Sequence, residues 1–151
     1  MQKITSFTID HTKLKEGIYV SRIDGDITTY DLRTRKPNSG DVMDNITMHT
    51  FEHMFATFIR NSVLSNDVIY FGPMGCQTGF YLLIRNADNK KVLELTKDIL
   101  LQIINHNGEV FGNSEIECGN YRTLRLEDAK TEAIRYLEIL NSKEQTFTYL
   151  Q

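Results

Sequence analysis

Residues 68–85 read VIYFGPMGCQTGFYLLIR, in which two short apolar segments flank a glycine-containing loop. The segments 68–71 and 80–85 have the length and composition of β-strands. Three glycines and one proline in the loop 72–79 favour a tight loop of fixed shape. This stretch therefore predicts two strands joined by a rigid loop that carries Cys76.

More strands are predicted on the N-terminal side of this stretch. Residues 17–23 and 26–32 are predicted to be strands that are joined by a turn at Asp24-Gly25-Asp26. Residues 4–11 are also rich in strand-forming types and predict a further strand, because alternate residues fall on opposite faces.

Three helices are predicted, each with a stripe of apolar residues on one side. The first begins after Asp44 or Asn45, either of which could cap it, and runs to about Leu64. The others run from Asp88 to about Asn107 and from about Glu127 to Leu140. Because strands and helices do not alternate strictly, we expect an α+β fold with a largely antiparallel sheet packed against helices.

Length and composition indicate an ordinary globular protein. The 151 residues predict a single domain, residues 1–151, with 40% hydrophobic residues and a net charge of −3. The dispersed charge and an isoelectric point near 5.8 argue against a nucleic-acid or anionic-membrane surface. No apolar run reaches the ~20 residues of a membrane helix, and residues 1–6 lack a signal-peptide core, so we expect a cytoplasmic protein.

The segment His49-Thr50-Phe51-Glu52-His53 falls inside the first predicted helix. His49 and His53 lie one turn apart on the same side, within reach of one ion, and Glu52 lies on the adjoining edge of that face. Two imidazoles that hold a metal beside a free carboxylate provide a Lewis acid and a proton acceptor together. The alternative is two partly exposed histidines beside a solvated glutamate, but the spacing favours the metal site.

A catalytic metal site normally has three protein ligands and one open position. The candidates for the third ligand are His11, His106, Cys76, Cys118 and the carboxylates. Cys118 precedes a glycine in a loop that could carry a thiolate to the helix, but the usual fate of a free cysteine is burial in the core. The spacing alone leaves these two readings equal. Two histidines and one cysteine would suit Zn²⁺ or Fe²⁺.

Cys76 lies on the rigid loop, where its sulfur could point at a neighbouring site. As a thiolate it would be a base or nucleophile, and as a thiol an acid. Packing beneath the loop is slightly favoured when these residues are considered alone. Arg33, at the end of a predicted strand, could pair with a substrate carboxylate or favour a thiolate, although a solvated arginine is the commoner outcome.

His-x-x-Glu-His is also the signature of inverted zinc peptidases, so a small metallohydrolase or peptidase is an alternative function. Its weakness is the length of the chain, since those folds usually take the third ligand from a distant carboxylate of a much larger protein. A metal-binding module without catalysis is another alternative. It explains neither the rigid loop of Cys76 nor the free carboxylate of Glu52.

Several separated segments occur in an order and spacing typical of one enzyme family. They are Ser6-Phe7 with Asp10-His11-Thr12, Tyr30-Asp31-Leu32-Arg33 with Pro37-Asn38, His49 to His53, Pro73 to Gly79, and Cys118-Gly119. On these segments, which extend over nearly the whole chain, the sequence resembles the S-ribosylhomocysteine lyases, the LuxS autoinducer-2 synthases. The resemblance implies an α+β, LuxS/metallohydrolase-like fold.

The resemblance also implies an activity. The family cleaves S-ribosyl-L-homocysteine to L-homocysteine and 4,5-dihydroxy-2,3-pentanedione, the precursor of the quorum-sensing signal autoinducer-2, and thereby recycles S-adenosylhomocysteine in the activated methyl cycle. Two carbonyl shifts along the ribose precede a β-elimination, and no redox cofactor is needed. Members are homodimers with active sites at the subunit interface, so the N-terminal segment is expected to serve the partner's site.

By position in the family motifs, His49, His53 and Cys118 would bind the metal, which in the family is Fe²⁺, with Zn²⁺ or Co²⁺ able to substitute. Glu52 and Cys76 would form the catalytic acid/base pair.

The same resemblance implies that Ser6, His11 and Arg33 bind the substrate, and that Arg33 favours the thiolate of Cys76. One departure is Tyr70-Phe71-Gly72, where many members have Asp-Ile-Ser. This departure removes a carboxylate near the cysteine.

Overall fold

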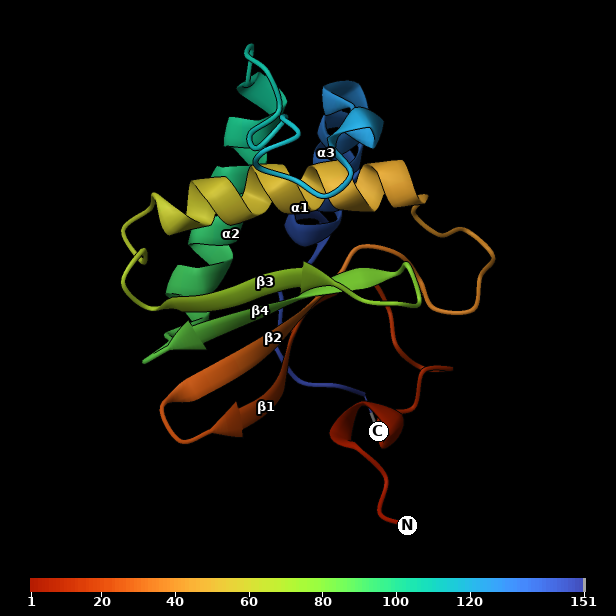
Figure 1. Cartoon of the computed structure of the whole chain (residues 1–151). Coiled ribbons are helices and arrows are strands. Elements are labelled where there is room, and N and C mark those ends of the chain that lie inside the picture. Colours follow the sequence, from red (N-terminus) through yellow and green to blue (C-terminus); the bar gives the residue numbers. More distant parts are fainter. Residues whose placement is uncertain (151) are drawn as a thin grey trace.

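One four-stranded antiparallel sheet forms the base of the computed structural model, which describes residues 1–150 (Figure 1). Its strands, in chain order, are β1 (Gly17–Asp24), β2 (Ile27–Arg33), β3 (Val68–Pro73) and β4 (Gly79–Arg85). They are arranged in the order β1-β2-β4-β3, and each pairs with its neighbours in antiparallel register. Gln151, the last residue of the predicted domain, lies outside the described residues.

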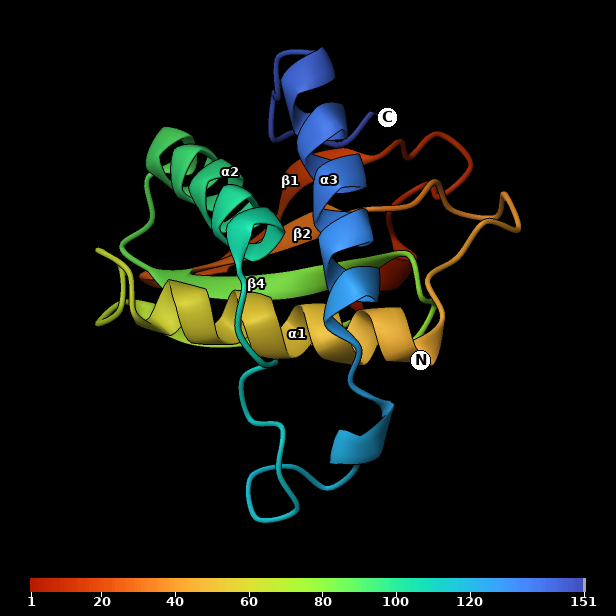
Figure 2. The same ribbon diagram turned by 90° about the horizontal axis from the view of Figure 1, so that it is seen from above.

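Three helices pack on one face of this sheet (Figure 2). They are α1 (Asn45–Arg60), α2 (Asn89–Asn105) and α3 (Leu126–Ser142). The core between α1 and the sheet is a stack of aromatic rings. Ring centroids lie 4.8 Å apart between Phe51 and Phe80 and 4.4 Å apart between Phe55 and Phe71. This packing fixes α1, the helix that carries His49 and His53, relative to β3 and β4.

The α+β class and the largely antiparallel sheet predicted from the sequence are confirmed. Asp44 caps α1, because its side chain accepts a hydrogen bond from the Thr47 amide, and Asp88 caps α2 in the same way. α1 ends at Arg60 rather than near Leu64, because Ser62 turns back to bond the Ile59 carbonyl. The similarity of the fold to metallohydrolases stays a prediction.

The strand predicted for residues 4–11 is wrong. The segment forms a short 3₁₀ helix, η1 (Thr5–Phe7), followed by turns. Short polar side chains satisfy the backbone locally, as Thr8 donates to the Thr5 carbonyl and Asp10 accepts from Thr12. The free edge of β1 is instead occupied by the C-terminal tail, where the Val20 amide donates to the Phe147 carbonyl at 2.9 Å.

Among the described residues, no helix combines the length and the apolar character that crossing a membrane requires.

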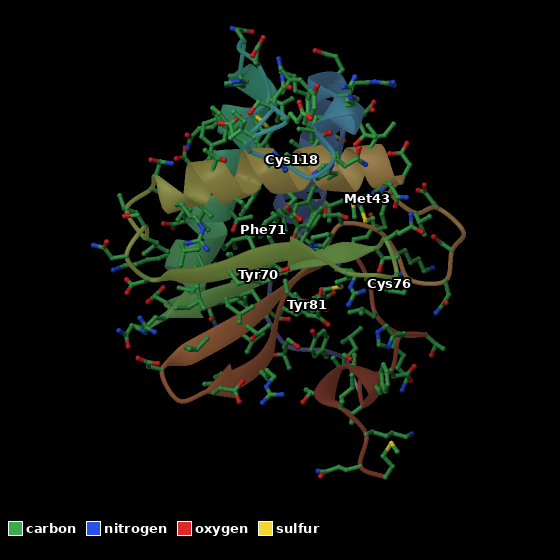
Figure 3. All side chains as sticks on the ribbon, viewed as in Figure 1. Met43, Tyr70, Phe71, Cys76, Tyr81 and Cys118 are labelled. Atoms are coloured by element: carbon green, nitrogen blue, oxygen red, sulfur yellow. The ribbon has the colours of Figure 1, made fainter. Side chains whose placement is uncertain are left out.

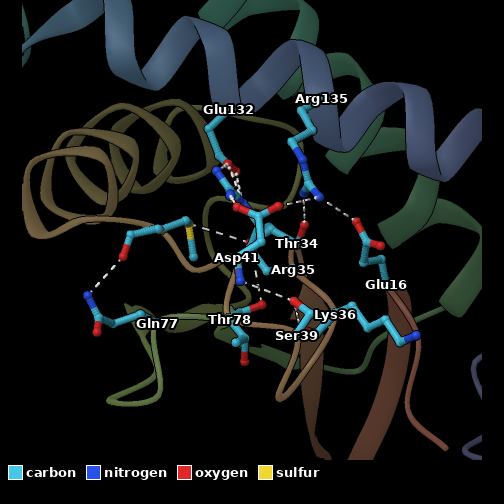
Figure 4. Close-up of polar contacts among 11 residues, drawn as sticks. Glu16, Thr34, Arg35, Lys36, Ser39, Asp41, Gln77, Thr78, Glu132 and Arg135 are labelled. Atoms are coloured by element: carbon cyan, nitrogen blue, oxygen red, sulfur yellow. Dashed lines mark hydrogen bonds and ion pairs between the residues drawn. The ribbon is translucent and has the colours of Figure 1, made fainter.

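An ionic network joins α3 to the segment between β2 and α1 (Figure 4). Arg35 on that segment binds Glu132 of α3 with its Nε and Nη2 atoms, 3.0 and 2.6 Å from Oε1, and the Glu132 side chain is 1% exposed. The amides of Thr34 and Arg35 both donate to the Thr78 carbonyl at 3.0 Å. The network thus holds the segment, and the segment holds the loop of Cys76.

Replacing Glu132 by Ala is expected to lower the free energy of unfolding by about 3 kcal/mol, because it leaves the mostly buried Arg35 without its main partner. Urea denaturation measures the change. Glu138→Ala is the matched control, since Glu138 is an exposed glutamate on the same helix, and its effect should stay within about 0.5 kcal/mol. Equal stabilities of the two variants would contradict the role of the network.

Candidate metal centre and active site

Two histidines of α1 and one cysteine of a distant loop bring three ligand atoms together. The rings of His49 and His53 lie 4.6 Å apart, and the Cys118 Sγ lies 3.4 Å from His49 Nε2 and 3.7 Å from His53 Nε2. The three ligand atoms lie within 4.8 Å of one another, and the residues are half-buried. Nitrogen and sulfur atoms at these separations could hold one metal ion.

The hydrogen bonds of the two rings test whether this group fits a metal. His53 Nδ1 lies 2.7 Å from the Phe111 carbonyl, which can only accept, so Nδ1 carries the proton and Nε2 presents its lone pair to Cys118. His49 Nδ1 lies 3.4 Å from the Thr123 hydroxyl on its outer side. Outer hydrogen bonds of this kind orient metal-binding imidazoles, so the donor set fits a divalent ion.

The loop that carries Cys118 reaches α1 because a glycine faces His53. Gly112 has a φ of +69°, and a Cβ there would lie 3.0 Å from His53 Nδ1. A larger residue would therefore be strained and would press on the ring. Further along the loop, the Asn120 amide donates to the Cys118 sulfur at 3.4 Å.

Of the candidates for a third ligand, the structure brings Cys118 to the two histidines. His106 instead bonds the Glu109 carbonyl at 2.8 Å, and His11 bonds the Ile9 carbonyl at 2.9 Å. Cys76 is exposed on the β3–β4 loop, whereas Cys118 lies above α1 (Figure 3).

Glu52 and His49 share an open groove of about 440 Å³. Burial raises the pKa of Glu52, and the nearby His53 partly offsets this effect. Burial lowers the pKa of His49, and the neighbouring His53 lowers it further. The groove is lined by Asn45, Ile46, Met48, His49, Glu52, Pro73, Asn120 and Thr123. A carboxylate therefore lies beside the candidate metal ligands, in a space large enough for a small molecule.

Cys76 and Arg33 form a second cluster at the end of the sheet. Cys76 Sγ lies 3.0 Å from the Thr78 hydroxyl and 3.8 Å from Arg33 Nη1. Arg33 is buried, and Asp31 binds it through two nitrogens at 3.1 and 2.7 Å. Pro73 is one of the residues that line the groove of Glu52, and it precedes Cys76 by three positions in the sequence.

Ser6, one of the two N-terminal candidates, lies on the other side of the sheet. Ser6 lies in η1, below the sheet and away from α1 in Figure 1. It lines a separate hollow of about 310 Å³ with Tyr70, Tyr81 and Leu83. Within the described chain, neither Ser6 nor His11 lines the groove of Glu52, and His11 is not part of the group of metal ligands.

Tyr70 and Gly72, the first and last residues of the segment that departs from the family pattern, lie against each other. A Cβ at Gly72 would overlap the hydroxyl of the Tyr70 side chain, which folds back over it. Tyr70 in this conformation therefore requires glycine at position 72.

Three residues that support the second cluster are not among those predicted from the sequence: Asp31, Thr78 and Tyr149. The contact of Asp31 with Arg33 could have been predicted, because residues two positions apart on a strand point to the same face. Thr78 stood in the quoted loop without a role assigned to it. Tyr149 bonds Asp31 across 118 positions of sequence, and no local pattern predicts such a contact.

Comparison with known proteins adds a whole-chain observation to this geometry. A model of the family described as S-Ribosylhomocysteinase (LuxS) matches residues 4–147. The chain belongs to this family. The resemblance predicted from the ordered motifs is thereby confirmed.

Several relatives of this LuxS-family chain are similar to it over their full length. The S-ribosylhomocysteine lyase of Borreliella afzelii (strain PKo) is 47% identical, and that of Desulfotalea psychrophila is 46% identical. The S-ribosylhomocysteine lyase of Clostridium beijerinckii is 40% identical. In each comparison, 99% of this chain and 99% of the relative are covered.

Proposed function

We propose that this chain is a metal-dependent lyase that cleaves S-ribosyl-L-homocysteine to L-homocysteine and 4,5-dihydroxy-2,3-pentanedione, the precursor of autoinducer-2. The observation that carries the proposal is the group of His49, His53 and Cys118, next to the groove that His49 lines together with Glu52, in a chain of the LuxS family. Relatives named S-ribosylhomocysteine lyase support the choice of substrate.

His49, His53 and Cys118 would hold the metal, for which we propose Fe²⁺, with Zn²⁺ or Co²⁺ able to substitute. A thiolate with two imidazoles suits borderline divalent ions of this kind. When bound, such an ion supplies a Lewis acid that stabilises negative charge on the sugar oxygens.

Glu52 and Cys76 would move the protons. Each carbonyl shift removes a proton from the carbon beside the carbonyl and delivers one to the former carbonyl carbon. The final β-elimination removes one more carbon-bound proton, breaks the carbon–sulfur bond and releases homocysteine as a thiol after protonation. A carboxylate on one side of the sugar and a cysteine on the other can each carry out some of these proton transfers. The proton transfers are balanced without an external oxidant or reductant.

The substrate would be held by Arg33, Ser6 and His11. Arg33 lies against Cys76 and would act on the substrate beside that sulfur, while Asp31 occupies its Nε and Nη2 atoms. Ser6 lies on the opposite side of the sheet from α1, and His11 follows it in the same N-terminal segment. They would reach the groove of a second copy rather than that of their own chain.

We therefore also propose a homodimer that packs through the open sheet face, with active sites at the interface. This face and η1 expose large apolar side chains: Phe7 is 69%, Ile23 65% and Tyr70 52% exposed. Exposed apolar patches of this kind are typical of interaction surfaces.

Replacing Leu83, which lines the hollow on this face, by Asp is expected to convert the dimer to a monomer and to abolish turnover, because it buries a charge in the interface. Sedimentation equilibrium measures the mass, which for the wild type should be twice the 17.5 kDa of the chain. Val63→Asp is the control, since Val63 is exposed in the turn after α1, and this variant should stay dimeric. A monomeric wild type with full activity would overturn the dimer.

We further propose a cytoplasmic location and a single domain over residues 1–151. The two free cysteines suit a reducing compartment. One apolar cluster, which extends from Ile18 to Leu140, supports the single domain.

The function is tested by the release of homocysteine from S-ribosylhomocysteine, read with a thiol reagent on anaerobically purified, metal-loaded protein. Release that requires the metal is the expected result. A folded, metal-loaded protein that releases no thiol would contradict the proposal, and peptide hydrolysis would then be examined.

A further inference from the structure

A buried hydroxyl lies between Cys76 and Arg33. Thr78 is 3% exposed, and its Oγ1 lies 3.0 Å from the Cys76 sulfur and 2.8 Å from Arg33 Nη1. Cys76 itself is exposed, so its sulfur is accessible from solvent while its hydrogen-bond partner is not.

The chemistry of these groups fixes the direction of the Arg33–Thr78 hydrogen bond and allows Thr78 to donate to Cys76. A guanidinium only donates, so the Thr78 oxygen accepts from Arg33. The single hydroxyl proton of Thr78 is then free to point at the Cys76 sulfur. Arg33 Nη1, at 3.8 Å, also donates toward the same atom. Both hydrogen-bond partners that the described residues offer this sulfur can therefore donate to it.

Two further groups hold Arg33 in this position. Asp31 accepts from Nε and Nη2 of Arg33, and both residues are buried, at 1% and 2% exposure. The Tyr149 hydroxyl donates to the same carboxylate at 2.8 Å, and its ring stacks on Tyr19 with centroids 4.9 Å apart. Burial and the charge of Asp31 raise the pKa of Tyr149, so the phenol keeps the proton that it donates.

We propose that Thr78 is a positioning residue that donates its hydroxyl proton to the sulfur of Cys76 and so holds Cys76 as a thiolate, with Arg33, Asp31 and Tyr149 fixing the direction of the donation. The C-terminal tail thereby contributes to the active site through Tyr149. The benefit to catalysis rests on the acid/base role proposed above for Cys76. The hydrogen-bond chain itself does not depend on that role.

The experiment measures how fast iodoacetamide alkylates Cys76 at neutral pH in the metal-loaded protein, with peptide mapping to identify the labelled cysteine. Only the thiolate displaces iodide, so the rate reports the fraction of ionised Cys76. Thr78→Val, which has nearly the same shape but no hydroxyl, is expected to react about tenfold more slowly. Thr78→Ser, which keeps the hydroxyl, should stay within about twofold of the wild type.

Tyr149→Phe is a second variant that leaves the loop of Cys76 untouched and keeps the aromatic stack. It should slow alkylation about two- to threefold, because it removes only the outermost donor of the chain. It keeps the proposal testable if Thr78→Val does not fold. Labelling of Cys118 in the same digest should be equal in all variants.

Equal alkylation of Cys76 in the wild type, Thr78→Val and Tyr149→Phe would overturn the inference. So would a loss in Thr78→Ser as large as in Thr78→Val, because shape rather than the hydroxyl would then matter. In the lyase assay we expect Thr78→Val to lower kcat and leave KM unchanged. A wild type without lyase activity but with the expected alkylation pattern would refute the proposed function alone.

Discussion

Replacing Glu52 by Gln is expected to lower the rate of homocysteine release about a thousandfold or more, with the metal content unchanged. The amide has the size of the carboxylate but cannot accept a proton from carbon, and a positioned acid/base group contributes about 10²–10⁴ in rate. Metal binding should persist because Glu52 lies outside the ligand group of His49, His53 and Cys118. Its side chain lines the groove beside His49, where a substrate would lie.

The matched control is Glu94→Gln, the same change at an exposed position of α2. Both variants should have the metal content and the denaturation midpoint of the wild type, and only Glu52→Gln should lose activity. Wild-type turnover by a metal-loaded Glu52→Gln protein would remove Glu52 from the mechanism. Loss of metal in that variant would instead indicate that Glu52 contributes to the metal site.

Replacing Cys118 by Ala is expected to weaken metal binding at least a hundredfold and to abolish turnover. Substitutions outside the ligand set already cost about 10–100-fold in metal affinity, and the loss of one of three ligands should cost no less. The Cys118 sulfur lies close to both histidine nitrogens, so no neighbouring side chain needs to move for it to act as a ligand. Metal content after dialysis against a weak chelator measures the effect.

Cys76→Ala is the control for this experiment, because it removes the other cysteine of the chain. It should keep the metal and lose activity, whereas Cys118→Ala should lose both. Equal metal content in the wild type and Cys118→Ala would exclude Cys118 as a ligand. Loss of metal in Cys76→Ala would mean that the two cysteine clusters are not separate.

Much of the fold follows from local patterns in the sequence. The His49–His53 spacing predicts a shared helix face, and the structure places the two rings one turn apart on α1. The loop 72–79 predicts the β3–β4 hairpin, because its glycines and proline permit a short connection. These features depend on neighbours in sequence, and a periodic pattern reports such neighbours well.

Features that depend on distant residues could not be predicted from local patterns. Residues 4–11 have the composition of a strand, but the tail at Phe147 pairs with β1 and the segment turns instead. The spacing left Cys118 equal between ligand and core residue, and only the family resemblance distinguished the two. The Tyr149–Asp31 bond joins the two ends of the chain and has no sequence signal.

The proposed lyase reaction is tested most directly by measuring both products of S-ribosylhomocysteine cleavage in one sample of metal-loaded protein. Homocysteine is quantified as free thiol, and the dicarbonyl is trapped with an aromatic diamine. We predict equimolar homocysteine and dicarbonyl, and neither product from Glu52→Gln. Homocysteine accompanied by ribose instead of the dicarbonyl would identify a hydrolase and would contradict the lyase reaction.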